Sequence, residues 1–80
     1  MHRYQPISRE IFEELEMRAA FRQPCRLLYR AFNGGTIAVQ TRILSLVQEP
    51  GGEYLVTGEG LRLRLDELLA VDGRQLQHWA

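Results

Sequence analysis

The sequence has few of the residues that form covalent cross-links or metal sites. It contains one cysteine, Cys25, and two histidines, His2 and His78, near opposite ends of the chain. A single cysteine excludes a disulfide within the chain. The cysteine and the two histidines are also too far apart in the sequence to match the short spacings of metal-binding motifs. We therefore expect no metal and no other cofactor, and we predict that Cys25 is a buried structural thiol.

Long apolar runs are also absent. No stretch approaches the roughly 20 apolar residues that a membrane-spanning helix needs. The first residues, MHRYQP, contain no apolar segment of the kind found in secretory signals. The sequence thus predicts neither a membrane span nor an export signal, and we expect the protein to be cytoplasmic.

Catalytic motifs are missing as well. The sequence has no Ser/His/Asp arrangement in a supporting context and no glycine-rich phosphate loop followed by lysine. The adjacent acids Asp66 and Glu67 are the nearest approach to an acid–base pair. Acids at a break between strands more often bond to backbone groups, so we expect that the protein is not an enzyme.

What remains is the composition of one small domain, which we take as residues 1–80. Hydrophobic residues make up 45% and charged residues 25% of the 80, which is ordinary for a globular chain. Ten basic and ten acidic residues give a net charge of zero. No overall field therefore attracts the protein to nucleic acid or to a membrane.

Residues 9–22, REIFEELEMRAAFR, predict a helix. Ser8 suits the N-cap, and Pro24 ends the helical pattern. Apolar residues at spacings of three and four predict one buried stripe. These are Ile11, Phe12, Leu15 and Ala19.

The same helix carries four glutamates in its first half: Glu10, Glu13, Glu14 and Glu16. Negative charge is favourable there because of the helix dipole. The acids therefore have a structural explanation, as helix-stabilising and solubilising groups. A docking surface for a basic partner is the other interpretation.

After Pro24 the pattern changes to that of strands, with alternating or β-branched residues. The turn sequences NGG, EPGG and GEG separate the segments. The predicted strands are residues 25–32, 36–43, 53–57, 61–65 and 68–71. Residues 44–48 continue the second strand or bend it, and the tail, residues 72–80, has no clear pattern.

These elements predict a mainly β, α+β fold. Five short antiparallel strands over residues 25–71 are typical of a small barrel, since closure removes exposed strand edges. The helix would cover one open end with its apolar stripe.

Small barrels include RNA-binding modules, so direct action on RNA is the alternative function. Its candidate residues are Arg30, Arg42, Arg62 and Arg64, with Tyr29, Phe32 and Tyr54 as stacking rings. Core packing of the rings and a solvated outer face explain these side chains more simply. Zero net charge also argues against direct RNA binding, because phosphate neutralisation dominates affinity for nucleic acids.

Three blocks of sequence carry a family likeness over about residues 4–71. The first is YQPI (4–7) with the acidic helix up to Leu15-Glu16; the others are EYLV (53–56) and LRLD (63–66). In this order and spacing the chain resembles Rof, the bacterial antiterminators that bind the termination factor Rho. It departs from the family in its neutral charge and in having Arg9 where the family has a cysteine.

The resemblance implies an N-terminal helix on a five-stranded Sm-like (SH3-like) barrel. It also implies a protein partner, Rho, whose primary RNA-binding site is covered by carboxylates that take the place of phosphates. The residues that match the family's partner-binding positions are Glu10, Glu13, Glu14 and Glu16, and more weakly Asp66 and Glu53. The resemblance favours a monomer.

Overall fold

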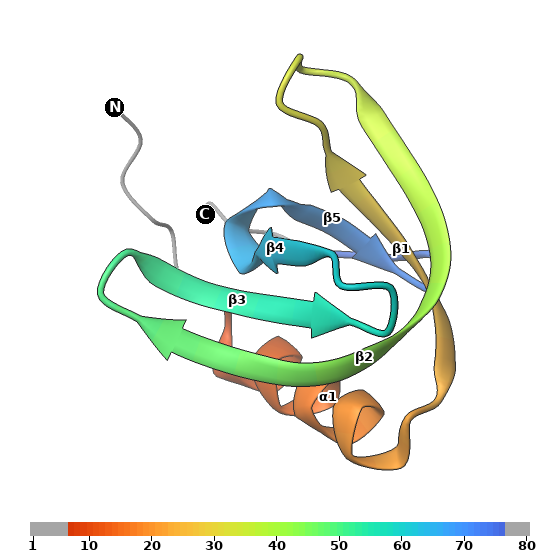
Figure 1. Cartoon of the computed structure of the whole chain (residues 1–80), viewed down its shortest axis with the longest axis vertical. Coiled ribbons are helices and arrows are strands. Elements are labelled where there is room, and N and C mark those ends of the chain that lie inside the picture. The colour runs from red at the N-terminus through yellow and green to blue at the C-terminus, as the bar shows by residue number, and fades with distance from the viewer. Residues whose placement is uncertain (1–6, 77–80) are drawn as a thin grey trace.

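One helix followed by strands makes up residues 7–76, the part of the chain that the computed structural model describes (Figure 1). The YQP of the first motif and both histidines lie outside these residues. The predicted mainly β, α+β class is confirmed. No helix within residues 7–76 has the length and apolar character to cross a membrane.

The helix α1 spans Arg9–Phe21. Ser8 is its N-cap, as predicted: the hydroxyl accepts a hydrogen bond from the N–H of Ile11 at 3.2 Å. The helix ends one residue earlier than predicted, because Arg22 adopts the left-handed conformation with φ 52°. This geometry closes the last turn through the bond from the Arg22 N–H to the carbonyl of Ala19.

Six strands form one antiparallel sheet, whereas the sequence predicted five. The sheet order is β4-β3-β2-β1-β5-β6, and β4 and β6 are its ends. The first predicted strand also proves shorter at its end, since the turn around Phe32 begins after Arg30. The strands are β1 (Pro24–Arg30), β2 (Thr36–Glu49), β3 (Gly52–Thr57), β4 (Arg62–Arg64), β5 (Leu68–Val71) and β6 (Arg74–Gln75); a short 3-10 turn, η1 (Leu65–Glu67), joins β4 to β5.

The long strand β2 is shared by two neighbours. Its first half pairs with β1, up to Arg42, and its second half pairs with β3, from Ile43 onward. The register shifts between Ile43 and Ser45, and the strand bends there. The sheet therefore curves around the core, as the long green ribbon in Figure 1 shows.

Residues 72–76, where the sequence has no clear pattern, form a turn and a short strand. Asp72 and Gly73 both have positive φ, 50° and 84°, and form a two-residue turn between β5 and β6. Asp-Gly between two strand-like segments is the usual signal for such a hairpin. Leu76 follows β6 and is buried.

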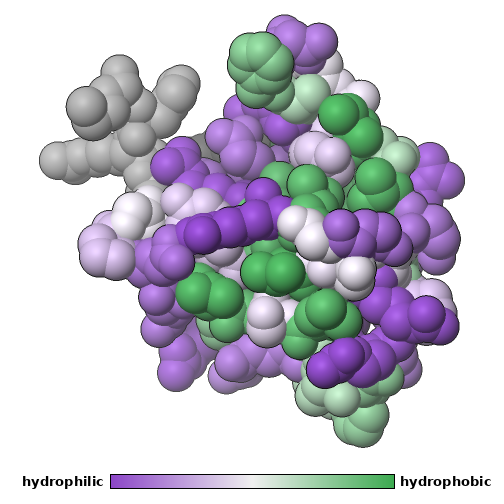
Figure 2. Space-filling model, in the orientation of Figure 1, coloured by the Kyte–Doolittle hydropathy of each residue, from purple (hydrophilic) through white to green (hydrophobic). Residues whose placement is uncertain are grey.

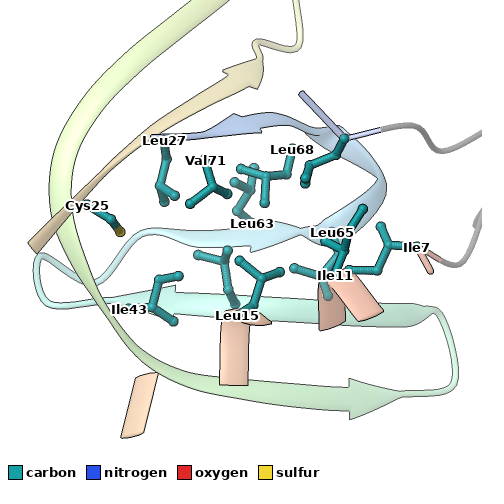
Figure 3. Packing of buried hydrophobic residues seen from close by; sticks show 12 residues of the cluster. Ile7, Ile11, Leu15, Cys25, Leu27, Ile43, Leu63, Leu65, Leu68 and Val71 are labelled. Atoms are coloured by element: carbon teal, nitrogen blue, oxygen red, sulfur yellow. The ribbon is translucent and has the colours of Figure 1, made fainter. Parts of the chain in front are cut away.

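The core lies between the curved sheet and the helix (Figure 3). The predicted helix stripe is confirmed, because Ile11 and Leu15 are buried while Phe12 and Ala19 pack at the margin. Cys25 is fully buried, as predicted. The other buried members of the cluster are Ile7, Leu27, Ile43, Leu55, Leu63, Leu65, Leu68, Val71 and Leu76.

Candidate functional site

The predicted acidic helix divides its glutamates between two sides. Glu10 and Glu14 form ion pairs with Arg74 of β6, on the side of the C-terminal hairpin. Glu13 and Glu16 line a groove between α1 and β2. The spacing of four residues places Glu10 and Glu14 on one face of the helix. Which strand lies beside that face depends on the tertiary structure.

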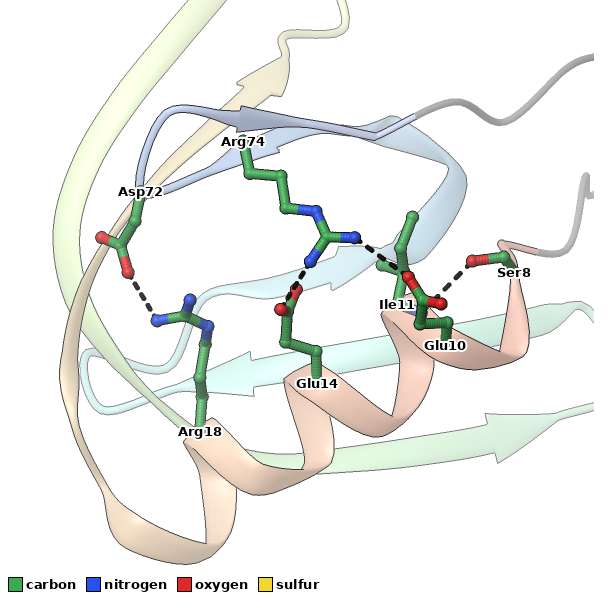
Figure 4. A network of polar contacts seen from close by, with 7 residues as sticks. All are labelled: Ser8, Glu10, Ile11, Glu14, Arg18, Asp72 and Arg74. Carbon is green, nitrogen blue, oxygen red and sulfur yellow. Dashed lines mark hydrogen bonds and ion pairs between the residues drawn. The ribbon is translucent and has the colours of Figure 1, made fainter.

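Arg74 bridges the first pair of acids (Figure 4). Its guanidinium nitrogens lie 2.6 Å from Glu14 Oε1 and 3.1 Å from Glu10 Oε1. Glu10 is 82% exposed, so its pair with Arg74 contributes little stability. The bridge nevertheless compensates part of the negative charge on this side of the helix.

A second contact joins the helix to the same hairpin. Arg18 Nη1 donates to Asp72 Oδ2 at 2.5 Å, and Asp72 Oδ1 accepts from the N–H of Arg26 at 2.8 Å. The N–H of Asp72 in turn donates to the carbonyl of Arg26 at 2.8 Å. Asp72 therefore ties the helix and β1 to the β5–β6 turn, a role that the sequence reading missed.

The second pair of acids is more available. Glu13 Oε2 lies 3.7 Å from Arg9 Nε, and both side chains are largely exposed, so this pair is weak. Glu16 is exposed and has no ion pair or side-chain hydrogen bond with the residues that the structure describes. These two carboxylates are therefore accessible to a partner.

Apolar side chains lie beside these acids in a groove that also contains Arg9 and Gln48. The groove between α1 and β2 has a volume of about 350 Å³ and includes Phe12 and Leu46. It continues past Glu16 and Leu46 into a hollow of about 360 Å³ that contains Ala19 and Leu44. Acidic groups beside apolar side chains suit the long side chains of arginine or lysine, which have an apolar stem and a charged end.

The other two predicted site residues lie outside this groove. Glu53 on β3 accepts a hydrogen bond from Gln48 Nε2 at 3.0 Å. Asp66 in η1 accepts from Arg64 Nε at 2.6 Å, and its side chain is only 9% exposed. Through this hydrogen bond Asp66 raises the pKa of Arg64, so the two side chains are engaged with each other within the fold.

The arginines of the RNA-binding interpretation are mostly engaged within the fold. Arg62 forms an ion pair with Glu49 and lies over the ring of Tyr54, 4.2 Å from its centre. Arg64 is paired with Asp66. Pairing with carboxylates reduces the positive charge that these strands offer to phosphates.

The remaining candidates for RNA contact are dispersed. Arg42 Nε donates to the carbonyl of Arg22 at 3.0 Å, and Arg30 is exposed on β1. Phe32 is fully exposed in the turn after β1, whereas Tyr29 is half-buried against the core. The structure therefore does not gather these residues into one basic, aromatic surface.

Comparison with protein-family models and with curated proteins finds no match. Within residues 7–76, no group of three or more histidine, cysteine or acidic side chains is placed to hold a metal ion. The features of this chain that bear on its function are the groove, its acids and the family likeness of the sequence.

Proposed function

We propose that this chain is a Rof-like antiterminator that binds Rho and covers its primary RNA-binding site. The observation that carries the proposal is the position of Glu13 and Glu16, which are exposed and line the groove between α1 and β2 together with Phe12 and Leu46. The family likeness of the YQPI block and the acidic helix supports the choice of partner.

The chemistry of such a contact is simple. A site that holds RNA phosphates presents arginine or lysine side chains, and carboxylates form charge-assisted hydrogen bonds with the same groups. Glu13 and Glu16 would take the place of phosphates, and Phe12 and Leu46 would cover the apolar stems of the basic side chains.

The fold supports the proposal through its topology. We infer that the curved sheet is an Sm-like barrel with α1 across one end. Strand β1 lies between β2 and β5, and β2 bends so that each half has its own neighbour. This arrangement wraps the sheet around one core. The face of α1 that points away from this core is exposed.

The test compares two double variants of the same helix in competition with RNA. Labelled oligo-C RNA bound to Rho is titrated with the protein, and fluorescence anisotropy reports displacement of the RNA. We expect Glu13→Gln with Glu16→Gln to weaken displacement at least about tenfold, or 1.4 kcal/mol. The matched control is Glu10→Gln with Glu14→Gln, which removes the same charge from acids that Arg74 already compensates.

Two results contradict the proposal. One is a wild-type protein that leaves the RNA on Rho. The other is a folded Glu13/Glu16 variant that competes as well as wild type. A parallel titration without Rho addresses the alternative: direct, salt-sensitive binding of the RNA would assign the protein to the RNA-binding modules.

A further inference from the structure

The first half of β2 is an open strand edge. From Thr36 to Thr41 it pairs with β1 on one side only, since pairing with β3 begins at Ile43. In Figure 1 the β1–β2 hairpin extends beyond the rest of the sheet, and no other described strand runs along the outer edge of β2 there.

The register shows which backbone groups this edge presents. The Ala31 N–H donates to the Gly35 carbonyl at 2.8 Å, so this pair is hydrogen-bonded. Bonded pairs alternate along an antiparallel ladder, which makes Tyr29/Ile37 and Leu27/Val39 the next ones. The N–H and C=O groups of Thr36, Ala38 and Gln40 therefore point away from β1.

An independent contact agrees with this assignment. Arg42 lies two residues after Gln40, so its carbonyl should also point away from β1. It does, because it accepts a hydrogen bond from the Gly58 N–H at 3.0 Å, on the β3 side. Beyond Arg42 the outer edge passes Thr41, whose hydroxyl donates to Glu59 of the β3–β4 turn. From there it continues toward Gln40 and Ala38, and no described strand pairs with it.

This edge also lacks the features that prevent strand pairing. Residues 36–41, TIAVQT, contain no charge, no proline and no glycine, and four of the six are β-branched. The two end strands differ, since β4 carries Arg62 and Arg64 and β6 carries Arg74. Edges with charged side chains are protected from pairing, whereas an uncharged β-branched edge favours it.

We propose that this edge pairs antiparallel with the same edge of a second copy, with Ala38 opposite Ala38. In this register Thr36 lies opposite Gln40, and every outward N–H and C=O of the three residues meets a partner. Ile37 lies opposite Val39 on the other face. No charged side chain of residues 36–41 opposes another, so the segment is self-complementary around a two-fold axis.

Apolar surface near the edge adds to the contact. Ile37 is 41% exposed and Phe32 is fully exposed at the hairpin tip. Figure 2 shows apolar side chains at the projecting hairpin and on the face below it. The antiparallel register brings each tip level with Arg42 of the other copy, beside a groove of about 440 Å³ that includes Pro24 and Leu44.

The interface is small, so the dimer is weak. One strand pair with two hairpin tips falls at or below about 1,200 Å² of total buried surface, the lower end for specific interfaces. We expect a dissociation constant on the order of 10–100 µM. The dimer does not depend on the Rho proposal, and it differs from the monomer that the family likeness favours.

The test uses charge at the two-fold axis. Sedimentation equilibrium on the full chain, from about 5 µM to 1 mM, measures the dimer. Ala38→Lys and Ala38→Glu each place like charges opposite one another and should weaken it at least tenfold. A one-to-one mixture of the two variants should restore the dimer. Ser45→Lys, an exposed position of β2 beyond the open edge, is the matched control and should dimerise like wild type.

Circular dichroism first establishes that each variant is folded. A wild-type chain that stays monomeric to about 1 mM overturns the proposal. Normal dimerisation of Ala38→Lys would place the interface elsewhere and overturn it too. Failure of the mixture to dimerise, after both variants fail alone, would refute the register with Ala38 on the axis.

Discussion

Replacing Asp72 with alanine is expected to destabilise the fold by about 2–3 kcal/mol, although the side chain lies at the surface. The largest contribution is the hydrogen bond that Asp72 accepts from the Arg26 N–H at 2.8 Å, worth about 1–1.5 kcal/mol. The exposed ion pair with Arg18 adds about 0.5 kcal/mol. Alanine is also less tolerant of φ 50° than aspartate, by roughly 0.5–1 kcal/mol.

Two further variants separate these contributions. Asp72→Asn keeps an acceptor oxygen and tolerance of positive φ, so it should cost only about 0.5–1 kcal/mol. Asp72→Gly removes the side chain but relieves the backbone, so it should fall between the other two. Urea unfolding followed by circular dichroism measures all three. With a slope near 1 kcal/mol/M for a chain this small, alanine should lower the midpoint by about 2–3 M.

An Asp72→Ala variant that is no less stable than Asp72→Asn would refute these contributions, because the bond to the Arg26 N–H and the left-handed geometry would then contribute nothing. If Asp72→Ala and Asp72→Gly cost the same, the positive φ contributes nothing, and only that contribution is refuted.

Four further predictions concern single sites. Leu15 is 1% exposed, so Leu15→Ala should cost about 3–4 kcal/mol in thermal unfolding, and a cost under about 1 kcal/mol would contradict its place in the core. Arg22→Gly should raise the free energy of unfolding by up to about 1 kcal/mol, measured in urea, because glycine adopts the left-handed C-cap without strain; a loss of stability would argue against this. The hydroxyl of Thr41 donates to Glu59 and lowers the pKa of that carboxyl, so Thr41→Val should raise it in an NMR titration. The stabilisation from this hydrogen bond is present above the ordinary glutamate pKa, roughly 4.3, and is lost as the pH falls through the lowered pKa of the folded state. The free energy of unfolding of the variant should therefore depend less on pH in that range. An unchanged Glu59 titration would refute the link. Burial raises the pKa of Cys25, so its thiol should react with Ellman's reagent only as fast as the fold opens, and rapid labelling of the folded protein would show that it is accessible.

Local sequence signals predicted the helix and most strands. Ser8, the stripe of Ile11 and Leu15, and the turn sequences act over a few residues, so they can be read directly. The strand in the tail was not predicted, for a different reason. The Asp72-Gly73 signal was present, but β6 has only two residues, too few for a visible alternation.

The candidate site was predicted in part. The sequence located the acids of α1, but it did not separate Glu14 from Glu16. That distinction depends on Arg74, which is 60 residues from Glu14 in the chain. Asp66 is among the predicted partner-binding residues, and within the fold it accepts a hydrogen bond from Arg64. Its role in partner binding stays a prediction. Whether the accessible acids bind Rho stays a prediction.

By itself, the sequence determined the α+β class, the helix with its cap and acids, and the buried thiol, because these follow from periodicity, side-chain chemistry and composition. Only the tertiary structure decided which glutamates are compensated, which residues line the groove and which part of β2 has an open edge. Those properties depend on contacts between distant segments, and the physical reason is the curvature of the sheet. The bend in β2 brings α1 against the second half of that strand and leaves the first half with one neighbour.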